Sequence, residues 1–321
     1  VLSDAGAVVV ESDAAVVVRR VKVLRCILVL GTGLGPPLQT STFGVSPGIT
    51  VLLPFTCDVS GTQCSQQRGS HVSLSVEDAQ FDHNSMDGIT TGGSSGGGMA
   101  IVVPYMVSAS VRGVTLVDLS FVRANFTDNQ AMVTLGGASA GGLSISVLET
   151  DGLTGYAIPV SLRLESCVFR NNVETGRAST TLLTAGGLGM LTSAFQALHA
   201  TVEDSVFELN VVNVTSDVPN VRIFGGLGFA QSRLVTSRPV VLQVTNCAFR
   251  GNRVLVVPEG YNGARNVNDF TLGGGMGFVI KGGCESCLVA LEDTEVEGNS
   301  ARLELGAGSL GPSSDNPSNL A

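Results

Sequence analysis

Acidic side chains recur at one place in the sequence, four residues before a phenylalanine or its equivalent. The carboxylates at this position are Glu77, Glu165, Glu203 and Glu292, and those directly after it are Asp78, Asp204 and Asp293. Clustered carboxylates could bind Ca²⁺ or act as the acid and base of a carbohydrate-active enzyme. An active site needs a constellation that occurs once, whereas these residues repeat. The pattern therefore favours an outward stripe over a catalytic centre.

The other residues with catalytic chemistry do not complete such a centre. His71, His83 and His199 stand apart, and no His-Gly or Arg-x-Lys arrangement joins them. The segment Gly31-Thr32-Gly33-Leu34-Gly35 resembles a nucleotide-binding loop, but Pro36 and Pro37 follow it where a helix would have to begin. We therefore predict no cofactor and no metal, and favour a protein that is not an enzyme.

Six of the seven cysteines form three pairs, and the seventh is Cys26. Cys57 and Cys64 flank a turn-like segment and could form a disulfide in an oxidising compartment. Cys284 and Cys287 lack both the second pair of a zinc site and the βαβ setting of a redox motif. Cys167 and Cys247 occupy the same position of the repeat, two repeats apart. That separation is too large for a disulfide, so we expect both to be free thiols in the core.

Composition limits the function classes further. The chain has 321 residues with 41 Gly, 14% charged residues and a net charge of −9, and only two of its 18 basic residues are lysine. This excludes the basic face that nucleic-acid binding requires. No uncharged apolar run reaches the roughly 18–20 residues of a membrane helix, so we predict no membrane span in this segment.

A repeat of about 43 residues predicts the fold. Its first element is Phe-x-x-Asn, which begins at Phe81, Phe126, Phe169, Phe207 and Phe249, with a degenerate copy at Val296. The residues nine, seven and five positions before the phenylalanine are apolar in all six copies, as in Val72, Leu74 and Val76. This alternation predicts a strand with one buried face. Short polar residues after it predict a bend and a second strand.

The second element of the repeat is Gly-Gly-[Leu/Met]-small-apolar. It occurs at 97–101, 141–145, 186–190, 225–229 and 274–278. Paired glycines allow a positive-φ turn and a close approach of neighbouring coils. We interpret the two elements as two rungs of an all-β, right-handed parallel β-helix, a solenoid with about two rungs per repeat.

The asparagine of Phe-x-x-Asn occurs once in each repeat. A stacked amide ladder needs one Asn in every rung. With two rungs per repeat these side chains would lie too far apart, so we expect each to bond the backbone of its own turn. We place an irregular lead-in region or cap at residues 1–70, repeats at 71–310 and a linker to a further region at 311–321.

Phe-x-x-Asn followed by a Gly-Gly-hydrophobic block resembles the repeats of chlamydial polymorphic outer-membrane proteins and of similar surface proteins of algae and protists. The match covers roughly residues 72–310, with Leu or Met in place of the family's Ala in Gly-Gly-Ala-Ile. The resemblance implies a β-helix at a cell surface that presents binding sites.

Recognition residues are expected in the segments that do not repeat. Tyr105, Tyr156 and Tyr261 all lie there, and Asn262 follows Tyr261 in the longest insert. We predict a ligand surface from these four residues. Asn125 and Asn213 are N-glycosylation acceptors by sequence, the first facing outward on a strand and the second in a variable loop.

The sequence as a whole predicts a non-enzymatic scaffold or adhesin-like binding module, extracellular or at the cell surface and part of a longer chain. A glycan or a cell-surface protein is the expected partner. The alternatives are a polysaccharide lyase or hydrolase on a pectate-lyase-like β-helix, and a spacer without a ligand.

Overall fold

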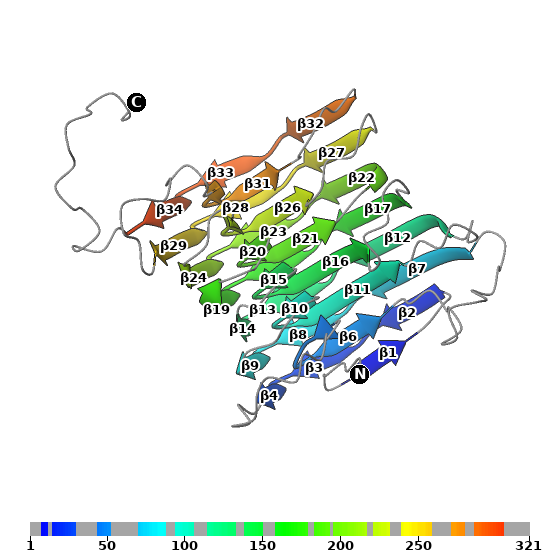
Figure 1. Cartoon of the computed structure of the whole chain (residues 1–321), viewed down its shortest axis with the longest axis horizontal. Helices are drawn as coiled ribbons and strands as arrows, with labels where there is room; N and C mark the ends of the chain where they lie inside the picture. The colour runs from blue at the N-terminus through cyan, green and yellow to red at the C-terminus, as the bar shows by residue number, and fades with distance from the viewer. Residues whose placement is uncertain are drawn as a thin grey trace.

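The computed structural model describes most of the chain and shows one stack of parallel β-strands (Figure 1). The described residues are 8–11, 15–29, 44–52, 70–87, 94–105, 114–132, 138–149, 158–178, 183–192, 195–216, 221–231, 239–258, 271–279 and 286–304. They form 34 strands and no helix. The all-β prediction is confirmed.

The strands form five parallel sheets, here called A to E. Sheet C contains β2 (Ala15–Arg19), β7 (Ser70–Glu77), β12 (Val114–Val122), β17 (Ile158–Glu165), β22 (Phe195–Glu203), β27 (Val240–Thr245) and β32 (Cys287–Glu292). Sheet D contains β3 (Lys22–Leu24), β8 (Gln80–Asp82), β13 (Asn125–Thr127), β18 (Val168–Arg170), β23 (Val206–Glu208), β28 (Ala248–Arg250) and β33 (Glu295–Glu297). Sheet E contains β4 (Ile27–Val29), β9 (Ser85–Asp87), β14 (Gln130–Met132), β19 (Val173–Ala178), β24 (Val211–Ser216), β29 (Arg253–Pro258) and β34 (Ser300–Leu303).

The remaining two sheets close each coil. Sheet A contains β5 (Gly44–Val45), β10 (Ser94–Gly96), β15 (Ala138–Ala140), β20 (Leu183–Ala185), β25 (Arg222–Phe224) and β30 (Thr271–Gly273). Sheet B contains β1 (Val8–Glu11), β6 (Ile49–Leu52), β11 (Met99–Tyr105), β16 (Leu143–Glu149), β21 (Leu188–Thr192), β26 (Leu227–Gln231) and β31 (Met276–Val279). The chain visits the sheets in the order C, D, E, A, B and then returns to C.

Each repeat makes one coil, so the prediction of two rungs per repeat is wrong. Val72 pairs with Val117 and Phe126 with Phe169, each exactly one repeat further on. The Gly-Gly strands likewise pair only with one another, as Met99 does with Leu143. Both apolar clusters of a repeat belong to one buried core, because they face each other across the same interior. Six steps of about 4.8 Å give a stack of about 29 Å, half the height that two rungs would give.

The stack also includes residues that the sequence assigned to an irregular lead-in region. β2, β3 and β4 pair in register with β7, β8 and β9. A regular coil therefore lies within residues 1–70, where the Phe-x-x-Asn and Gly-Gly motifs are absent. Residues 311–321 lie outside the described part of the chain.

The alternating apolar pattern is confirmed as the buried face of sheet C. Its inward residues are buried in every coil up to β27, while those of β32 are exposed because no coil is described beyond it. The phenylalanines of sheet D form a continuous stack next to them. Neighbouring rings have centroids 4.6–4.9 Å apart and planes within 3° of parallel.

Two columns of left-handed residues turn the chain at the C–D and D–E corners. The first contains Arg20, Asp78, Arg123, Ser166, Asp204, Asn246 and Asp293, and the second Arg25, His83, Asp128, Asn171, Leu209, Gly251 and Gly298. The bend predicted from the short polar residues is confirmed, since Asp and Asn tolerate positive φ better than most side chains. The positive φ predicted for the paired glycines is wrong, because none of the described Gly-Gly pairs has it.

The paired glycines instead serve close approach between coils. A Cβ on Gly141 would lie 2.6 Å from the carbonyl oxygen of Gly186 and 2.7 Å from the amide nitrogen of Val173. Backbone from two directions thus occupies the space that any side chain would need.

Gly141→Ala is therefore expected to lower the free energy of unfolding by about 2–3 kcal/mol. Gly189→Ala is the matched control, since its Cβ would lie 3.3 Å from its nearest neighbours and Ala100 occupies the same column. Urea unfolding of both variants measures the difference. Equal stability of the two variants would contradict this account of the glycines.

The asparagines of the motif form the amide ladder that the two-rung interpretation excluded. The Nδ2 group of Asn129 donates to Oδ1 of Asn172 at 3.0 Å and to the Phe81 carbonyl at 2.9 Å. The Asn129 backbone amide donates to the same Oδ1 at 3.2 Å. This pattern repeats from Asn84 to Asn299. One coil per repeat is what places these side chains within reach.

Leu209 is a misfit in the second corner column. Its φ is 56°, and the next coil has Gly251 at the equivalent place. Leu209→Asn is expected to raise the free energy of unfolding by about 0.5–1 kcal/mol, because Asn adopts this conformation with less strain. Val211→Asn, in ordinary strand conformation two residues later, should destabilise. A Leu209→Asn protein that melts below the wild type would contradict the strain argument.

The prediction on membrane spans agrees with the structure as far as helices go. Within the described ranges, no helix is long and apolar enough to cross a membrane.

Candidate functional site

The outward face of sheet C carries the acidic stripe predicted from the sequence. Register pairing places Glu77, Val122, Glu165, Glu203, Thr245 and Glu292 in one column, with Arg19 before them. The stripe is neutralised in part by arginines. Arg19 forms a bidentate pair with Glu77 across one coil, with Nε–Oε2 at 2.9 Å.

Ion pairs between neighbouring coils continue along the corners and the outward side of sheet D. Arg123 Nε lies 2.6 Å from Asp78 Oδ1, and Arg170 Nε lies 2.8 Å from Glu208 Oε2. The hydrogen bond from Arg123 holds the pKa of Asp78 below its ordinary value. These pairs lie on the open surface, where each contributes little stability. They form a ladder rather than a constellation that occurs once.

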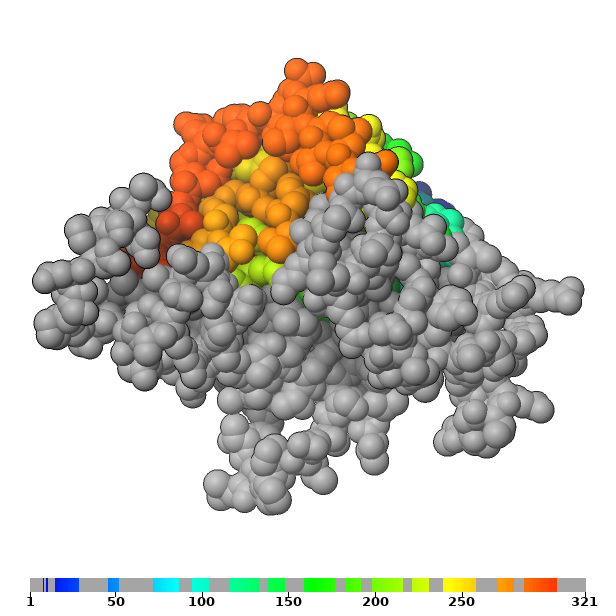
Figure 2. Space-filling model, turned by 45° about the horizontal axis from the view of Figure 1, so that its top comes forward, coloured from blue at the N-terminus to red at the C-terminus, as the bar shows by residue number. Residues whose placement is uncertain are grey.

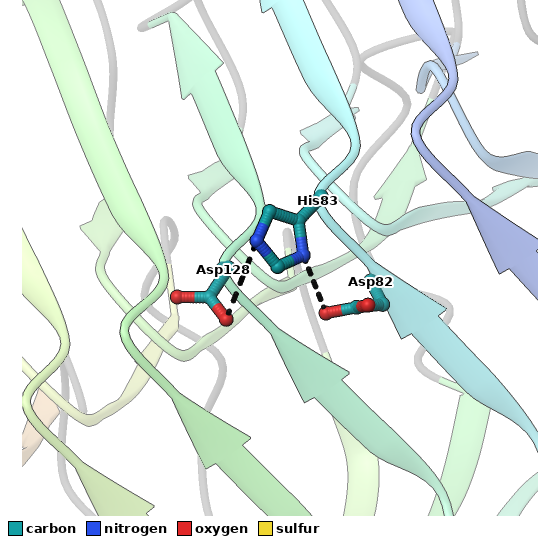
Figure 3. A group of neighbouring side chains, drawn as sticks. All are labelled: Asp82, His83 and Asp128. Atoms are coloured by element: carbon teal, nitrogen blue, oxygen red, sulfur yellow. Dashed lines mark hydrogen bonds and ion pairs between the residues drawn. The ribbon is translucent and has the colours of Figure 1, made fainter.

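One cluster interrupts this ladder at the D–E corner. Figure 3 shows the imidazole ring of His83 between two carboxylates from neighbouring coils. Its Nδ1 lies 2.8 Å from Oδ1 of Asp82, and its Nε2 lies 3.9 Å from Oδ2 of Asp128. In the described part of the chain, no other set of three such side chains has ligand atoms this close together.

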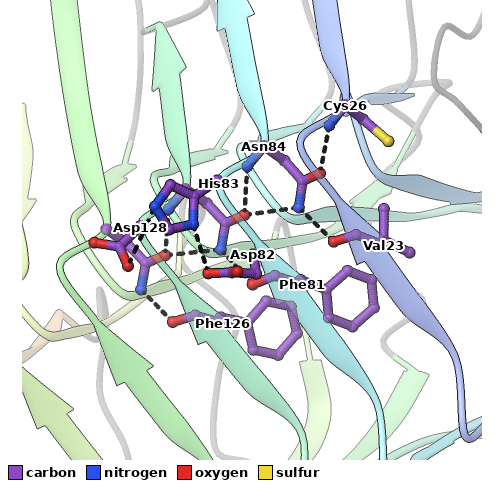
Figure 4. A network of polar contacts seen from close by, with 10 residues as sticks. Val23, Cys26, Phe81, Asp82, His83, Asn84, Phe126 and Asp128 are labelled. Carbon is purple, nitrogen blue, oxygen red and sulfur yellow. Dashed lines mark hydrogen bonds and ion pairs between the residues drawn. The ribbon is translucent and has the colours of Figure 1, made fainter.

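The tight corners position this cluster. His83 and Asp128 both have φ 53° and occupy the same column, so their side chains leave the coil in one direction. Figure 4 shows the cluster beside Asn84 and the stacked phenylalanines, which fix the backbone beneath it. The three ligand atoms lie within 4.8 Å of one another, a spacing at which they could share one divalent cation.

Sequence analysis missed this cluster although a signal for it was present. Asp128 stands 45 residues after His83, one repeat on at the same position. With two rungs per repeat these residues would lie two coils apart. Counting one coil per repeat makes them neighbours.

A second polar group is sealed inside the solenoid. Glu174 replaces an apolar residue in the inward column of sheet E, where Ala131 and Val212 are its neighbours. Its Oε1 accepts a hydrogen bond from Ser139, whose hydroxyl lies 2.8 Å from that of Ser95. Burial raises the pKa of Glu174 well above its ordinary value, and the bond to Ser139 lowers it in part.

Three buried polar atoms have no hydrogen-bond partner among the described residues. They are Oε2 of Glu174, Oγ1 of Thr184 and Nη1 of Arg222. Thr184 pairs in register with Ser139, so two of these atoms flank the same serine. A protonated Glu174 is neutral, which is the form that such an interior stabilises.

The structure does not describe the side chains of the four predicted ligand residues. Tyr105 ends β11, and its side chain lies outside the described part, as do Tyr156, Tyr261 and Asn262 entirely. Tyr156 lies in the sequence between β16 and β17. Tyr261 belongs to the connection from β29 to β30, between sheets E and A.

Both glycosylation acceptors are exposed. Asn125 faces outward on β13, as predicted. Asn213 is also exposed, but it lies within strand β24 rather than in a variable loop.

The cysteines agree in part with the sequence analysis. Cys167 and Cys247 are free and buried, as predicted, and burial raises the pKa of Cys167 to about 11. Cys287 is disulfide-bonded. The predicted pair Cys57 and Cys64 lies outside the described residues.

Comparison of the chain with protein-family models, curated proteins and solved structures finds no significant match. The likeness to chlamydial polymorphic outer-membrane proteins therefore rests on the two short motifs and stays a prediction.

Proposed function

We propose that this chain is a non-enzymatic scaffold that presents binding segments outside the cell or at its surface. The observation that carries the proposal is the placement of the variable segments. In the coil from β7 to β11, the C–D, D–E and A–B connections are two residues each. The E–A and B–C connections, residues 88–93 and 106–113, are longer.

Every complete coil repeats this division. The E–A and B–C connections vary from two residues, 193–194, to seventeen, 53–69, while the other three connections contain two residues everywhere except at 46–48, which contains three. Variable segments on a constant support are where recognition is usually found. Two lines of such segments along one rigid stack form a surface suited to a glycan or a cell-surface protein.

Three further observations support an extracellular protein built in this way. Cys287 is disulfide-bonded, which is typical of oxidising compartments. Asn125 and Asn213 are exposed acceptors for glycosylation. We assign the solenoid a right-handed course, since crossovers between parallel strands of one sheet nearly always have that hand.

A glycan array and intact cells probed with the purified chain test the proposal. Replacing residues 259–268 by a Gly-Ser linker, or Tyr105 by Ala, is expected to abolish binding at the E–A or the B–C line. Thr201→Ala, on the outward face of β22, is the control and should bind normally. Retention of full binding by both variants would overturn the proposal, and absence of any binding would favour a spacer.

The enzymatic alternative rests on the cluster of His83 with Asp82 and Asp128, because a histidine between carboxylates is suited to proton transfer. Incubation with pectic, alginate or chondroitin-type polymers tests it. Our proposal predicts no cleavage. Cleavage that is lost in His83→Ala or Glu203→Gln would establish the enzyme instead.

A further inference from the structure

The last coil leaves its interior face uncovered. Val289, Leu291 and Val296 point inward by register, yet they are 45%, 52% and 58% exposed. Their counterparts one coil earlier, Leu242, Val244 and Phe249, are at most 1% exposed. Figure 2 shows this coil, coloured orange to red, on the surface turned toward the viewer. Among the described residues, no strand pairs with the outer edge of β32 or β33, and an open strand edge is a template for a further strand.

In sheets C, D and E, the two ends of the stack carry opposite charge, while β1 at the first end of sheet B ends in Glu11. Residues 286–304 of the last coil contain five acidic residues and one basic residue. Residues 15–29 of the first coil contain four basic residues and no acidic one. Arg20, Lys22 and Arg25 on that first coil are exposed.

Each of three basic residues of the first coil lies in the same column of the stack as one acidic residue of the last coil. The outward column of sheet C begins with Arg19 and ends with Glu292, and the column of sheet D that begins with Lys22 ends with Glu295. The corner between them begins with Arg20 and ends with Asp293. If the first coil of one molecule lay on the last coil of another in the same register, three basic residues would therefore face three acidic ones.

The molecule already contains this contact between its own coils. Arg19 pairs with Glu77 in the same column, and Arg123 pairs with Asp78 in the same corner. Opposite charges on adjacent positions of these columns thus lie in bonding geometry at the ordinary coil spacing. Stacking would reproduce that geometry across the ends.

We propose that a second copy of this chain stacks head to tail on the last coil, with its first coil on β32 and β33. The contact extends sheets C and D across the junction and covers the exposed apolar side chains of the last coil. The inward valines of the first coil, Val16, Val18 and Val23, are already only 8% exposed, so most apolar area buried comes from the last coil. Such a contact does not close on itself and produces linear assemblies.

Sedimentation velocity over a concentration series tests this inference. The wild type is expected to form species of increasing length as its concentration rises, and to dissociate at about 0.5 M salt, where charge pairs are screened. Glu292→Lys combined with Asp293→Lys should weaken association at least about tenfold, because it places like charges together. Glu203→Lys combined with Asp204→Lys makes the same change in the same columns two coils from the end. This control should associate as the wild type does.

A charge swap separates stacking from misfolding. Arg19→Glu combined with Arg20→Glu should also remain monomeric alone, and mixing it with the Glu292→Lys, Asp293→Lys protein should restore assembly, because these four positions align pairwise in the register. A wild type that stays monomeric at all concentrations would overturn the inference. So would a closed dimer, or association that the reversal at the last coil leaves unchanged. The ligand-binding tests above do not depend on the result, since they concern the E–A and B–C connections.

Discussion

Asn172→Ala is expected to lower the free energy of unfolding by about 3–5 kcal/mol, although the residue lies in a corner and outside the apolar core. Its Oδ1 accepts from the backbone and side-chain nitrogens of Asn129, and its Nδ2 donates to the Phe126 carbonyl and to Asn210. The substitution leaves these groups buried without their partners. Losing hydrogen bonds in this way costs more than the bonds themselves contribute.

Two further variants separate hydrogen bonding from volume. Asn172→Asp keeps the size of the side chain but removes the donor to the Phe126 carbonyl and to Asn210, so it should also destabilise by several kcal/mol at neutral pH, on the order of the alanine variant. Asn125→Ala, exposed on β13 of the preceding coil, should change stability by less than about 0.5 kcal/mol. Chemical denaturation measures all three. A loss confined to the alanine variant would assign the effect to packing and contradict the ladder.

Glu174→Gln is expected to remove a loss of stability that the wild type shows as the pH rises. Glu174 is fully buried, and burial raises its pKa in the folded state well above the ordinary value. The folded chain therefore keeps a proton that the unfolded chain releases at about pH 4.3. Between that pH and the raised pKa, the free energy of unfolding falls by up to about 1.4 kcal/mol per pH unit.

The sign distinguishes this residue from the surface carboxylates. The hydrogen bond from Arg19 lowers the pKa of Glu77, so its contribution is present above the unfolded pKa and is lost as the pH falls. Urea unfolding of the wild type and Glu174→Gln between pH 5 and 8 isolates Glu174, because that window lies above the pKa of the paired surface carboxyls and the three histidines are common to both proteins. The same slope in both proteins would contradict a buried, protonated Glu174. Glu77→Gln is the control and should leave the slope in this window unchanged.

Much of the fold follows from local rules that the sequence displays. Alternating apolar residues such as Leu119 and Phe121 predict the buried face of sheet C, and polar residues such as Asp78 predict the bend after it. Both depend only on neighbours in the chain. The register of each strand with the next repeat follows from the same spacing.

The number of coils per repeat depends on contacts that no local pattern records. The Gly-Gly strand and the Phe strand have similar alternation, so either could be the neighbour of the other in a stack. The structure pairs Met99 with Leu143 and Phe126 with Phe169. The amide ladder carried the missing information, since one asparagine per repeat can stack only when one coil separates its members.

The candidate sites were less predictable for the same reason. His83 and Asp128 become neighbours only after the coil count is known. Glu174 lies in the inward column of sheet E, in a strand that neither repeat motif marks. The complementary ends become visible only when the first coil, which lacks the repeat motifs, is recognised as a coil.

One distance tests the coil count on which the scaffold and the end-to-end contact both depend. Leu24 and Glu297 occupy the same outward column of sheet D, six coil steps apart. Spin labels introduced at these two positions as non-natural amino acids allow the distance to be measured by pulsed electron paramagnetic resonance. One coil per repeat predicts a separation of about 29 Å, whereas two coils per repeat would give about 58 Å and contradict the account.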